Sequence, residues 1–439
     1  MLNINPDYLF TEDNINIQYL YKLIDNYILQ EVPTYKELLN NYNKELTDNI
    51  IINHCKYITD TITAYVFSKP IQYNNISKNF AENMVLIDED SHNYELGKQV
   101  SIFGNSHELI YIDEDNTIRL AVLSPINCFV VYNNAIIPKP VAAIYFNQEF
   151  NIDGEPSGYS VLVYSTDNIY QLQGKELDKL AVVNIEPHYF KNIPIIEYKN
   201  NKENIGDFRD VIGLVKAYEQ LQSNRCTDKQ QFVDRLLVLT NTSLGDTQEE
   251  FERSKKILKE GGILELAGEN GNVSAQFISQ TFNENEVEVL RKSIENDIFR
   301  MARIPNLADE NFGNTASGIS LKYKLFGTET LAGTKERYFK KGLRERINII
   351  NNIYNLKNTG MDLSDIDIIM ERNMPIGLDE RLTELQGTEG LLSLETRLSR
   401  YDSELDVNEE VRRLNKEKQD NFNMYSHPQD QNEDEETLL

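Results

Sequence analysis

The sequence predicts an α+β chain in which a helical start, a β-rich middle and a long, mainly helical second half follow one another. Three observations predict this order. Apolar residues recur at helical intervals before residue 70, alternating β-branched runs fill residues 101–200, and helical spacing returns after residue 207. The chain has 439 residues, of which 40% are hydrophobic, so it can bury a sizeable core in two or three domains.

The first 70 residues are expected to be mostly helical. Apolar side chains such as Ile58 and Ile62 follow helical spacing within 35–65. The pattern ends at Pro70, because proline disfavours helix in the residue before it. Residues 71–100 have the mixed character of helix and loop.

Residues 101–200 predict an antiparallel β region of about six strands. The strand-like runs include SIFGNSHELIYID, TIRLAVLSP, NCFVVYN and YSVLVYS. Turn-forming pairs separate them, for example Asp115-Asn116 and Asp153-Gly154. The region contains no glycine-rich phosphate-binding motif, so it offers no nucleotide site.

A long helix is expected over 207–235, about 43 Å at 1.5 Å per residue. Its middle, QSNRCTDKQQ, is almost wholly polar. Such a helix cannot sit in the core of a monomer, so it should line a space or pack against copies of itself. A second helix, capped by Asn283, stops before Pro305.

Between these two helices, residues 236–282 predict a small α/β insert at the end of a two-helix stalk. LLVLTNT, GILEL and SAQFISQ are typical of strands, and TQEEFERSKKILKEG is typical of a short amphipathic helix.

The second half begins with a loop over 305–317 that is rich in Asn, Asp and Gly. One very long helix should run from Gly318 to about Leu356, interrupted by glycines at 327, 333 and 342 that permit bending. A turn region with the strand DIDIIM follows, then helix over 381–420. The acidic end, QDQNEDEETLL, predicts a disordered tail.

The net charge of −26 excludes general electrostatic wrapping of DNA. An acidic channel wall could still surround DNA, because it repels phosphates and leaves few sites where DNA binds tightly. Composition alone favours the simpler interpretation that the charge keeps the protein soluble. No apolar run approaches the roughly 18 residues of a membrane helix. The start, MLNINPDYLFTEDN, lacks the features of a signal peptide, so we expect a cytoplasmic protein without a membrane partner.

Chemistry-bearing residues are scattered. Cys55, Cys128 and Cys226 form no CxxC pair, so buried free thiols are expected, and the five His residues suggest no metal site or cofactor. The acidic strings 113–115 and 365–367 have the character of surface carboxylates. We therefore expect no enzyme. The alternatives are an acidic nucleic-acid-processing enzyme subunit, such as a nuclease subunit, and a generic oligomeric scaffold.

Six strings, in order along the chain, resemble the portal proteins of tailed bacteriophages, in the branch typical of phages of Gram-positive hosts. They are SKPIQY (68–73), GNSHELIY (104–111), IPIIEYKNN (193–201), AYEQLQSNRCTDKQQFVDRLLVL (217–239), IPNLADENFGNTASG (304–318) and GLLSLET (390–396). The resemblance covers about 51–418, is weak before residue 50, and includes no fused C-terminal domain.

The resemblance implies a dodecameric ring at the unique capsid vertex, through which double-stranded DNA is packaged and ejected. Its parts would be a wing (1–205), a first stem helix (206–235), a clip (236–282), a second stem helix (283–303), a tunnel loop (304–318), a wing long helix and strand (319–375), a helical crown (376–425) and a disordered acidic tail (426–439). Implied partners are the major capsid and scaffolding proteins, the terminase large subunit, the head–tail connector and DNA bound without sequence specificity. The ring would be assembled in the host cytoplasm and reside in the virion.

Three groups of candidate site residues follow. The tunnel loop would touch DNA through Asn306, Asp309, Glu310, Asn311, Asn314, Thr315 and Ser317, unless it is a plain connection. The stem would face the channel, or equally a neighbouring subunit, through Gln222, Arg225, Asp228, Lys229, Glu286, Lys292 and Glu295.

The third group lies in a segment where basic residues outnumber acidic ones, unlike in the chain as a whole. Eight basic residues (322, 324, 335, 337, 340, 341, 344 and 346) stand against three acidic ones between Lys322 and Arg346. Lys322, Lys324, Lys340, Lys341 and Arg344 could face DNA in the lumen. Pairing with acidic neighbouring subunits is the favoured interpretation, because the chain is so acidic.

Overall fold

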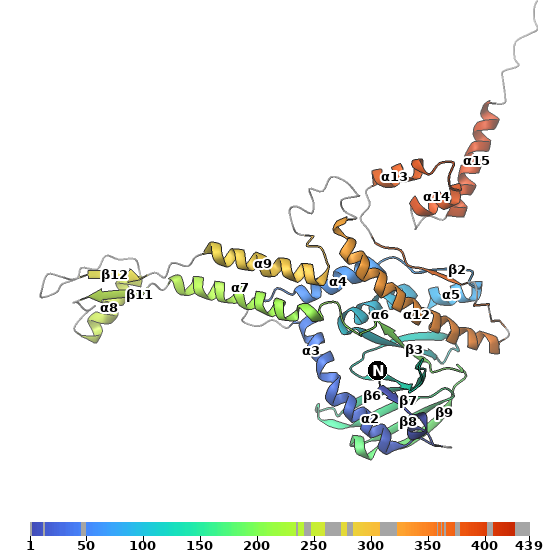
Figure 1. Ribbon diagram of the computed structural model, residues 1–439, viewed down its shortest axis with the longest axis horizontal. Coiled ribbons are helices and arrows are strands. Elements are labelled where there is room, and N and C mark those ends of the chain that lie inside the picture. Colours follow the sequence, from blue (N-terminus) through green and yellow to red (C-terminus); the bar gives the residue numbers. More distant parts are fainter. Residues whose placement is uncertain are drawn as a thin grey trace, which may run out of the picture. The chain divides into compact units, whose positions relative to one another are not determined.

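The computed structural model describes most of the chain in two compact units (Figure 1). The described residues are 2–11, 14–44, 50–233, 236–240, 247–259, 274–278, 284–307, 323–357, 359–360, 362–363, 366–373, 378–401 and 407–425. The first unit comprises Met1–Asp309 with Lys324–Asn373, and the second comprises Glu310–Tyr323 with Met374–Leu439. The predicted α+β class is confirmed.

The N-terminal helices are α1 (Pro6–Leu9), α2 (Ile17–Gln30), α3 (Val32–Tyr42) and α4 (His54–Phe67). Asparagine side chains accept backbone N–H groups at the starts of α1, α2 and α4. Tyr27 of α2 stacks on Phe129 and donates its hydroxyl to the carbonyl of Pro125 at 2.5 Å, which docks α2 on the β region. The helical prediction holds here, apart from the short strand β1 (Leu2–Ile4).

Residues 101–200, all described, form eight strands rather than about six, and they divide into two sheets. The three-stranded sheet has the order β10 (Ile195–Lys199), β3 (Asn105–Ile112), β4 (Ile118–Leu123). The larger sheet has the order β1, β5 (Cys128–Asn133), β6 (Pro140–Phe150), β7 (Pro156–Tyr164), β8 (Asn168–Gly174), β9 (Ala181–Pro187). The short 3₁₀ helix η1 (Leu177–Lys179) joins β8 to β9.

The strand predicted from residue 101 in fact begins at Asn105. Ser101–Phe103 are the last turn of α6 (Glu89–Phe103), and Gly104 ends that helix in the left-handed region with φ 89°. A side chain there would also collide with the backbone of Asn204, so only glycine fits.

The remaining elements of the first unit pack around α6. They are β2 (Gln72–Asn74), α5 (Lys78–Leu86), α12 (Phe326–Leu356) and β13 (Asp367–Ile369), with β13 antiparallel to β2. The helix predicted over 318–356 is present from Phe326 as α12, which runs unbroken through all three glycines, and residues 318–322 lie outside the described part of the chain. Gly342 is there for packing, because a Cβ atom would lie 2.4 Å from the ring of Tyr198.

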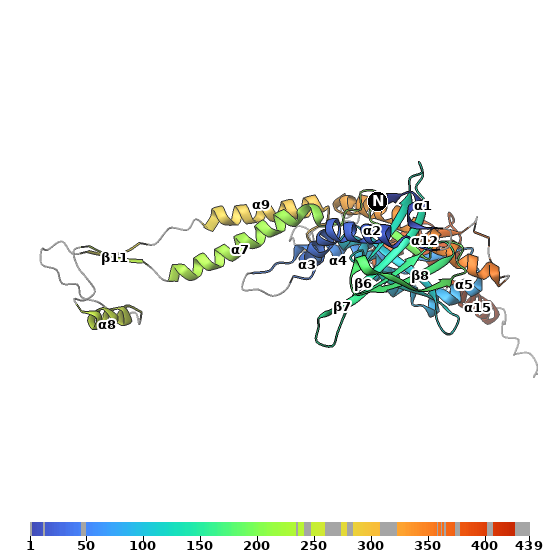
Figure 2. The ribbon, with the colours of Figure 1, turned by 90° about the horizontal axis from the view of Figure 1, so that it is seen from below.

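Two long helices lie side by side in both views (Figures 1 and 2). They are α7 (Ile212–Val233), preceded by the 3₁₀ turn η2 (Arg209–Val211), and α9 (Glu284–Ala302). The intervening segment contains β11 (Leu236–Thr240) antiparallel to β12 (Ser274–Ile278), and α8 (Gln248–Lys259). These match the predicted stalk helices, two strands and amphipathic helix, while GILEL lies outside the described residues.

The second unit contains α13 (Leu378–Gly387), α14 (Leu394–Tyr401) and α15 (Val407–Tyr425). Much of the span 381–420 is helical, as predicted, but residues 388–393 form a turn and 402–406 lie outside the described residues. The acidic tail after 425 lies outside the described part of the chain. Among the described helices, none combines the length and the apolar character needed to cross a membrane.

Candidate functional site

The two stalk helices are braced by ion pairs within one chain. The guanidinium of Arg225 on α7 donates to Glu288 and to Glu284 of α9, both at 2.9 Å. The side chain of Arg225 keeps only 21% of its exposure. Arg225 therefore pairs with the second helix of its own stalk.

Arg291 of α9 forms the second brace. It donates to Glu288 and Glu295 at 2.8 Å and to the hydroxyl of Tyr218 on α7 at 3.0 Å. The hydrogen bond from Arg291, followed by the one from Arg225, lowers the pKa of Glu288 to about 2, so this carboxylate stays ionised. Glu288, Arg291 and Glu295 follow the i, i+3, i+7 spacing of one helix face.

The predicted stem residues therefore fall into different groups. Arg225 and Glu295 belong to the internal brace, whereas Asp228, Glu286 and Lys292 are exposed. Gln222 is half-buried, and the side chain of Lys229 lies outside the described residues. Which of the exposed side chains face a channel stays a prediction. The sequence analysis missed Arg291 and Tyr218, although the spacing of charges around Arg291 was visible.

The cysteine expectation needs one correction. Cys55 and Cys128 are buried free thiols, but Cys226 is exposed. The reason is its position in the polar middle of α7, where no apolar surface covers it.

A buried ion pair joins α12 to the root of the stalk. The ammonium of Lys335 lies 2.7 Å from Asp207 and 2.6 Å from the hydroxyl of Ser101. Burial lowers the pKa of Lys335, while the charge of Asp207 opposes that shift. With Lys335 only 1% exposed, it faces neither a lumen nor a neighbouring subunit, which corrects its place in the basic group.

Arg346 sits deeper still, fully buried between α12, α6 and β3. It donates to Glu108 at 2.9 Å, to Glu89 at 2.6 Å and to the side-chain oxygen of Asn93 at 2.8 Å. Burial alone would raise the pKa of Glu108, but Arg346 and then His92 outweigh it and hold the pKa at about 2. Arg346 is therefore a structural cation of the core.

The other basic candidates lie nearer the surface. Lys340 pairs with Glu336 of its own helix at 2.6 Å, and the ammonium of Lys341 lies 4.8 Å from the ring centre of Tyr338. Lys324 and Arg344 are exposed, and Lys322 lies outside the described residues.

The first residues of the predicted tunnel loop are anchored in the first unit. The hydroxyl of Tyr57 donates to the carbonyl of Pro305 at 3.4 Å and accepts the N–H of Leu307 at 3.3 Å. On the far side, the hydroxyl of Thr328 donates to the carbonyl of Arg303 at 2.8 Å, which ties the start of α12 to the end of α9. Asn306 is half-buried at this base. The other loop candidates, Asp309, Glu310, Asn311, Asn314, Thr315 and Ser317, lie outside the described residues.

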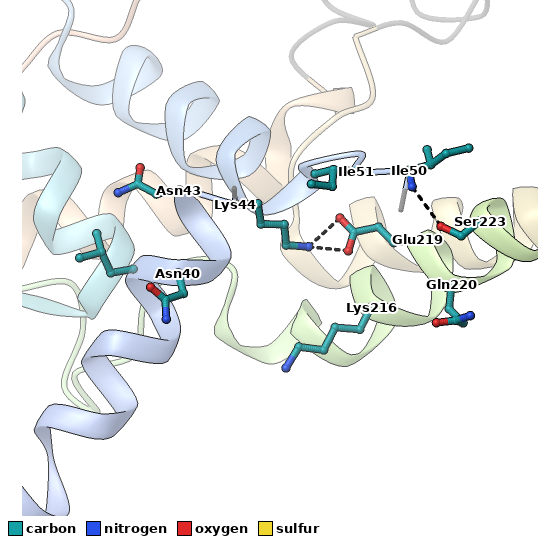
Figure 3. A pocket seen from close by; sticks show the side chains of 10 residues that line it. Asn40, Asn43, Lys44, Ile50, Ile51, Lys216, Glu219, Gln220 and Ser223 are labelled. Atoms are coloured by element: carbon teal, nitrogen blue, oxygen red, sulfur yellow. Dashed lines mark hydrogen bonds and ion pairs between the residues drawn. The ribbon is translucent and has the colours of Figure 1, made fainter. Parts of the chain in front are cut away.

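A cavity of about 750 Å³ opens at the root of the stalk between α3 and α7 (Figure 3). Lys44 points at Glu219 and pairs with it at 2.5 Å, and the N–H of Ile50 donates to Ser223 at 3.1 Å. Lysines and side-chain amides make up most of its polar wall. Nowhere in the described ranges do three or more His, Cys, Asp or Glu side chains gather as metal ligands.

The stalk helices α7 and α9 and the long helix α12 lie within a span that a family model matches. The model for phage portal protein, SPP1 Gp6-like, matches residues 8–423. The chain belongs to the phage portal protein family. This family is a structural one, and membership implies a virion component that assembles as a homo-oligomeric ring at the capsid vertex.

The chain is also similar to individual proteins. The chain is 23% identical over 392 residues to the portal protein of Bacillus phage SPP1, covering 82% of this chain and 74% of that protein. Among solved structures it is similar to a chain from the virion of a native gene transfer agent particle, with 11% identity, a TM-score of 0.41, and 83% and 91% of the two chains covered. A chain from the neck of an empty particle of that kind gives 11% identity, a TM-score of 0.37, and 78% and 88% coverage.

Proposed function

We propose that twelve copies of this chain form the ring through which double-stranded DNA enters and leaves the capsid of a tailed phage. The observation that carries the proposal is the family match from residue 8 to residue 423, which includes the whole stalk, the loop and α12. The protein would act as a conduit without chemistry of its own.

The finer assignments follow from the parts of the chain. The segment 236–282 would dock the terminase large subunit and later the head–tail connector. The wing, 1–205, would meet the major capsid and scaffolding proteins. The loop 304–318 would narrow the channel and touch phosphates without reading sequence. Assembly would take place in the host cytoplasm.

The internal braces support a conduit in mechanical terms. Arg225 and Arg291 tie α7 to α9, and Lys335 ties α12 to the stalk root. A loop whose first residues are anchored beside this frame could change its own conformation while the frame keeps its shape. The net charge of −26 per chain would repel phosphates, which leaves passing DNA few places to bind tightly.

Electron microscopy of the purified protein, with its mass in solution measured by light scattering, tests the proposal. We expect rings with a central hole wide enough for a duplex. A chain that stays monomeric at every protein and salt concentration would contradict it. A nuclease assay with Mg²⁺ or Mn²⁺ should show no cleavage of duplex or single-stranded DNA. Cleavage that disappears when the acidic residues of 113–115 or 365–367 are replaced would favour the enzyme alternative.

A further inference from the structure

The outward face of α12 carries a line of positive charge. Arg337, Lys341 and Arg344 are exposed and follow the 3- and 4-residue spacing of one helix face. They border a shallow groove of about 560 Å³ whose lining also includes Thr334, Tyr338 and Lys340. We call Arg337, Lys341 and Arg344 the basic stripe.

No carboxylate within the described part of the chain pairs with the basic stripe. Two of the three acidic residues of α12, Glu329 and Glu336, are held by Arg372 at 3.2 and 2.6 Å. The third, Glu345, lies about 40° from Lys341 around the helix, but no ion pair between described residues joins it to the basic stripe. The chain has 70 acidic and 44 basic residues, so a face that carries three such cations is a local reversal of its charge. A partner with negative charge fits this face.

An acidic surface of matching character lies at the junction of α5 and α6. Val85 and Leu86 project with 81% and 71% of their surface exposed, and Asp88 and Asp90 are exposed beside them. Burial, and then the charges of Glu89 and Asp88, raise the pKa of Asp90, so these carboxylates crowd one another. Exposed apolar side chains rimmed by charge are typical of protein interfaces. We call Val85, Leu86, Asp88 and Asp90 the acidic corner.

The basic stripe does not face the acidic corner of its own chain. Arg346, on the inward face of α12, contacts Glu89 and Asn93 in the first turns of α6. At about 100° per residue, Arg337 projects about 180° from Arg346 around α12. The basic stripe therefore faces away from the helix that carries the acidic corner. A head-to-tail ring contact requires two different, complementary surfaces that do not meet within one subunit.

We propose that the basic stripe of one copy docks on the acidic corner of the next copy around the ring. Arg337, Lys341 and Arg344 face Asp88 and Asp90, and the ring of Tyr338 covers Val85 and Leu86. The inference rests on the proposed ring. It assigns the stripe to a second copy of this chain rather than to DNA, because the chain itself supplies a surface with the matching charge and apolar pair.

Charge reversal and its restoration test the pairing in the full-length protein. Arg337→Glu/Lys341→Glu/Arg344→Glu and Asp88→Lys/Asp90→Lys should each reduce the fraction of chain found in rings at low salt at least about tenfold, because like charges then meet. Combining all five substitutions should restore rings. Circular dichroism of each variant checks that the subunit still folds.

The outcomes separate the two proposals. Wild-type protein that forms no ring overturns both the proposed function and the pairing. Wild-type rings together with undiminished rings of the stripe variant overturn the pairing alone. If those variant rings also retain less DNA at low salt than wild-type rings, the stripe is a DNA-binding surface instead.

A disulfide test covers the case in which charge reversal prevents folding. Lys341→Cys/Asp90→Cys, made in a Cys226→Ser background because Cys226 is the exposed native thiol, should give a ladder of covalent oligomers on mild oxidation. Each single cysteine variant should give none. Intact rings of the double variant that do not crosslink would overturn the pairing.

Discussion

The two faces of α12 show how one helix uses the same kinds of residue for opposite purposes. On the inward face, Lys335 and Arg346 are at most 1% exposed, and carboxylates of the same chain neutralise both. On the outward face, Lys341 and Arg344 are exposed without a carboxylate partner in the described chain. The inward cations stabilise the folded subunit, and the outward cations are available for contacts with other molecules.

The difference follows from the energetics of charge. A buried ion leaves water at a cost of several kcal/mol and is tolerated only with well-placed partners, so removing one partner is expensive. An exposed cation stays hydrated, and its removal hardly changes folding. Matched substitutions on the two faces should therefore separate stability from assembly.

The largest effect is expected from Arg346→Met. It leaves Glu89 and Glu108 buried without their cation, which should lower the free energy of unfolding by about 3–5 kcal/mol. Arg344→Met, two positions earlier, should change it by less than about 0.5 kcal/mol. Urea unfolding of both variants, followed by circular dichroism, measures the contrast. Equal effects of the two substitutions would abolish the distinction between the faces.

Lys335→Met should cost about 3 kcal/mol, because the carboxylate of Asp207 is then buried without its cation and keeps only the hydrogen bond from Asn200 within the described chain. Lys341→Met loses only a contact with Tyr338, worth about 0.5–1 kcal/mol. The double variant Lys335→Met/Asp207→Leu should recover part of the loss, since it removes both charges. If the double variant is no more stable than Lys335→Met alone, the unpaired Asp207 is not the cause.

Buried residues of the first unit should also be the source of acid sensitivity. Burial lowers the pKa of His107 to about 4, against the charge of Glu197, so the folded state holds this side chain neutral. His107 binds a proton more tightly in the unfolded chain than in the folded one. The contribution of neutral His107 to the free energy of unfolding is therefore fully present above about pH 6.5, and it falls by about 3 kcal/mol as the pH drops toward 4. Glu108, with a pKa of about 2, loses its contribution only as the pH falls from about 4.5 toward 2.

His107→Gln tests this assignment. The variant should show a flatter dependence of unfolding free energy on pH between 6.5 and 4, measured by urea unfolding at closely spaced pH values. Burial lowers the pKa values of His54 and His188 in the same direction, so a remaining slope is expected. An unchanged slope would show that His107 titrates normally in the folded protein.

The smallest contrast concerns the glycines of α12. Gly342→Ala places a methyl group against the Tyr198 ring and should cost about 1–3 kcal/mol. Gly333 has no atom near its missing side chain, so Gly333→Ala should be neutral or stabilise by up to about 1 kcal/mol. Thermal unfolding of the two variants decides between packing and bending as the reason for Gly342. Equal, small effects would favour bending.

Much of the local structure could be predicted because it depends on neighbours in sequence. Helical spacing located α4, α7, α9 and most of α12, and alternation located the strands of the β region. The number of strands was underestimated because β9 is an almost wholly exposed edge strand, so no alternating buried face marks it in the sequence. The start of β3 was misplaced because Ile102 and Phe103 suit the buried end of a helix as well as a strand.

By itself, the sequence determined the family and the order of the parts, because ordered strings and periodic patterns are local and survive without the fold. Only the tertiary structure decided which basic residues of the long helix are internal. Lys335 finds Asp207 across 128 positions, and Arg346 finds Glu89 across 257. In the sequence, Arg344 and Arg346 are equivalent members of one basic run. Two residues of helix rotate the side chain by about 200°, which sends one into the core and the other to the surface.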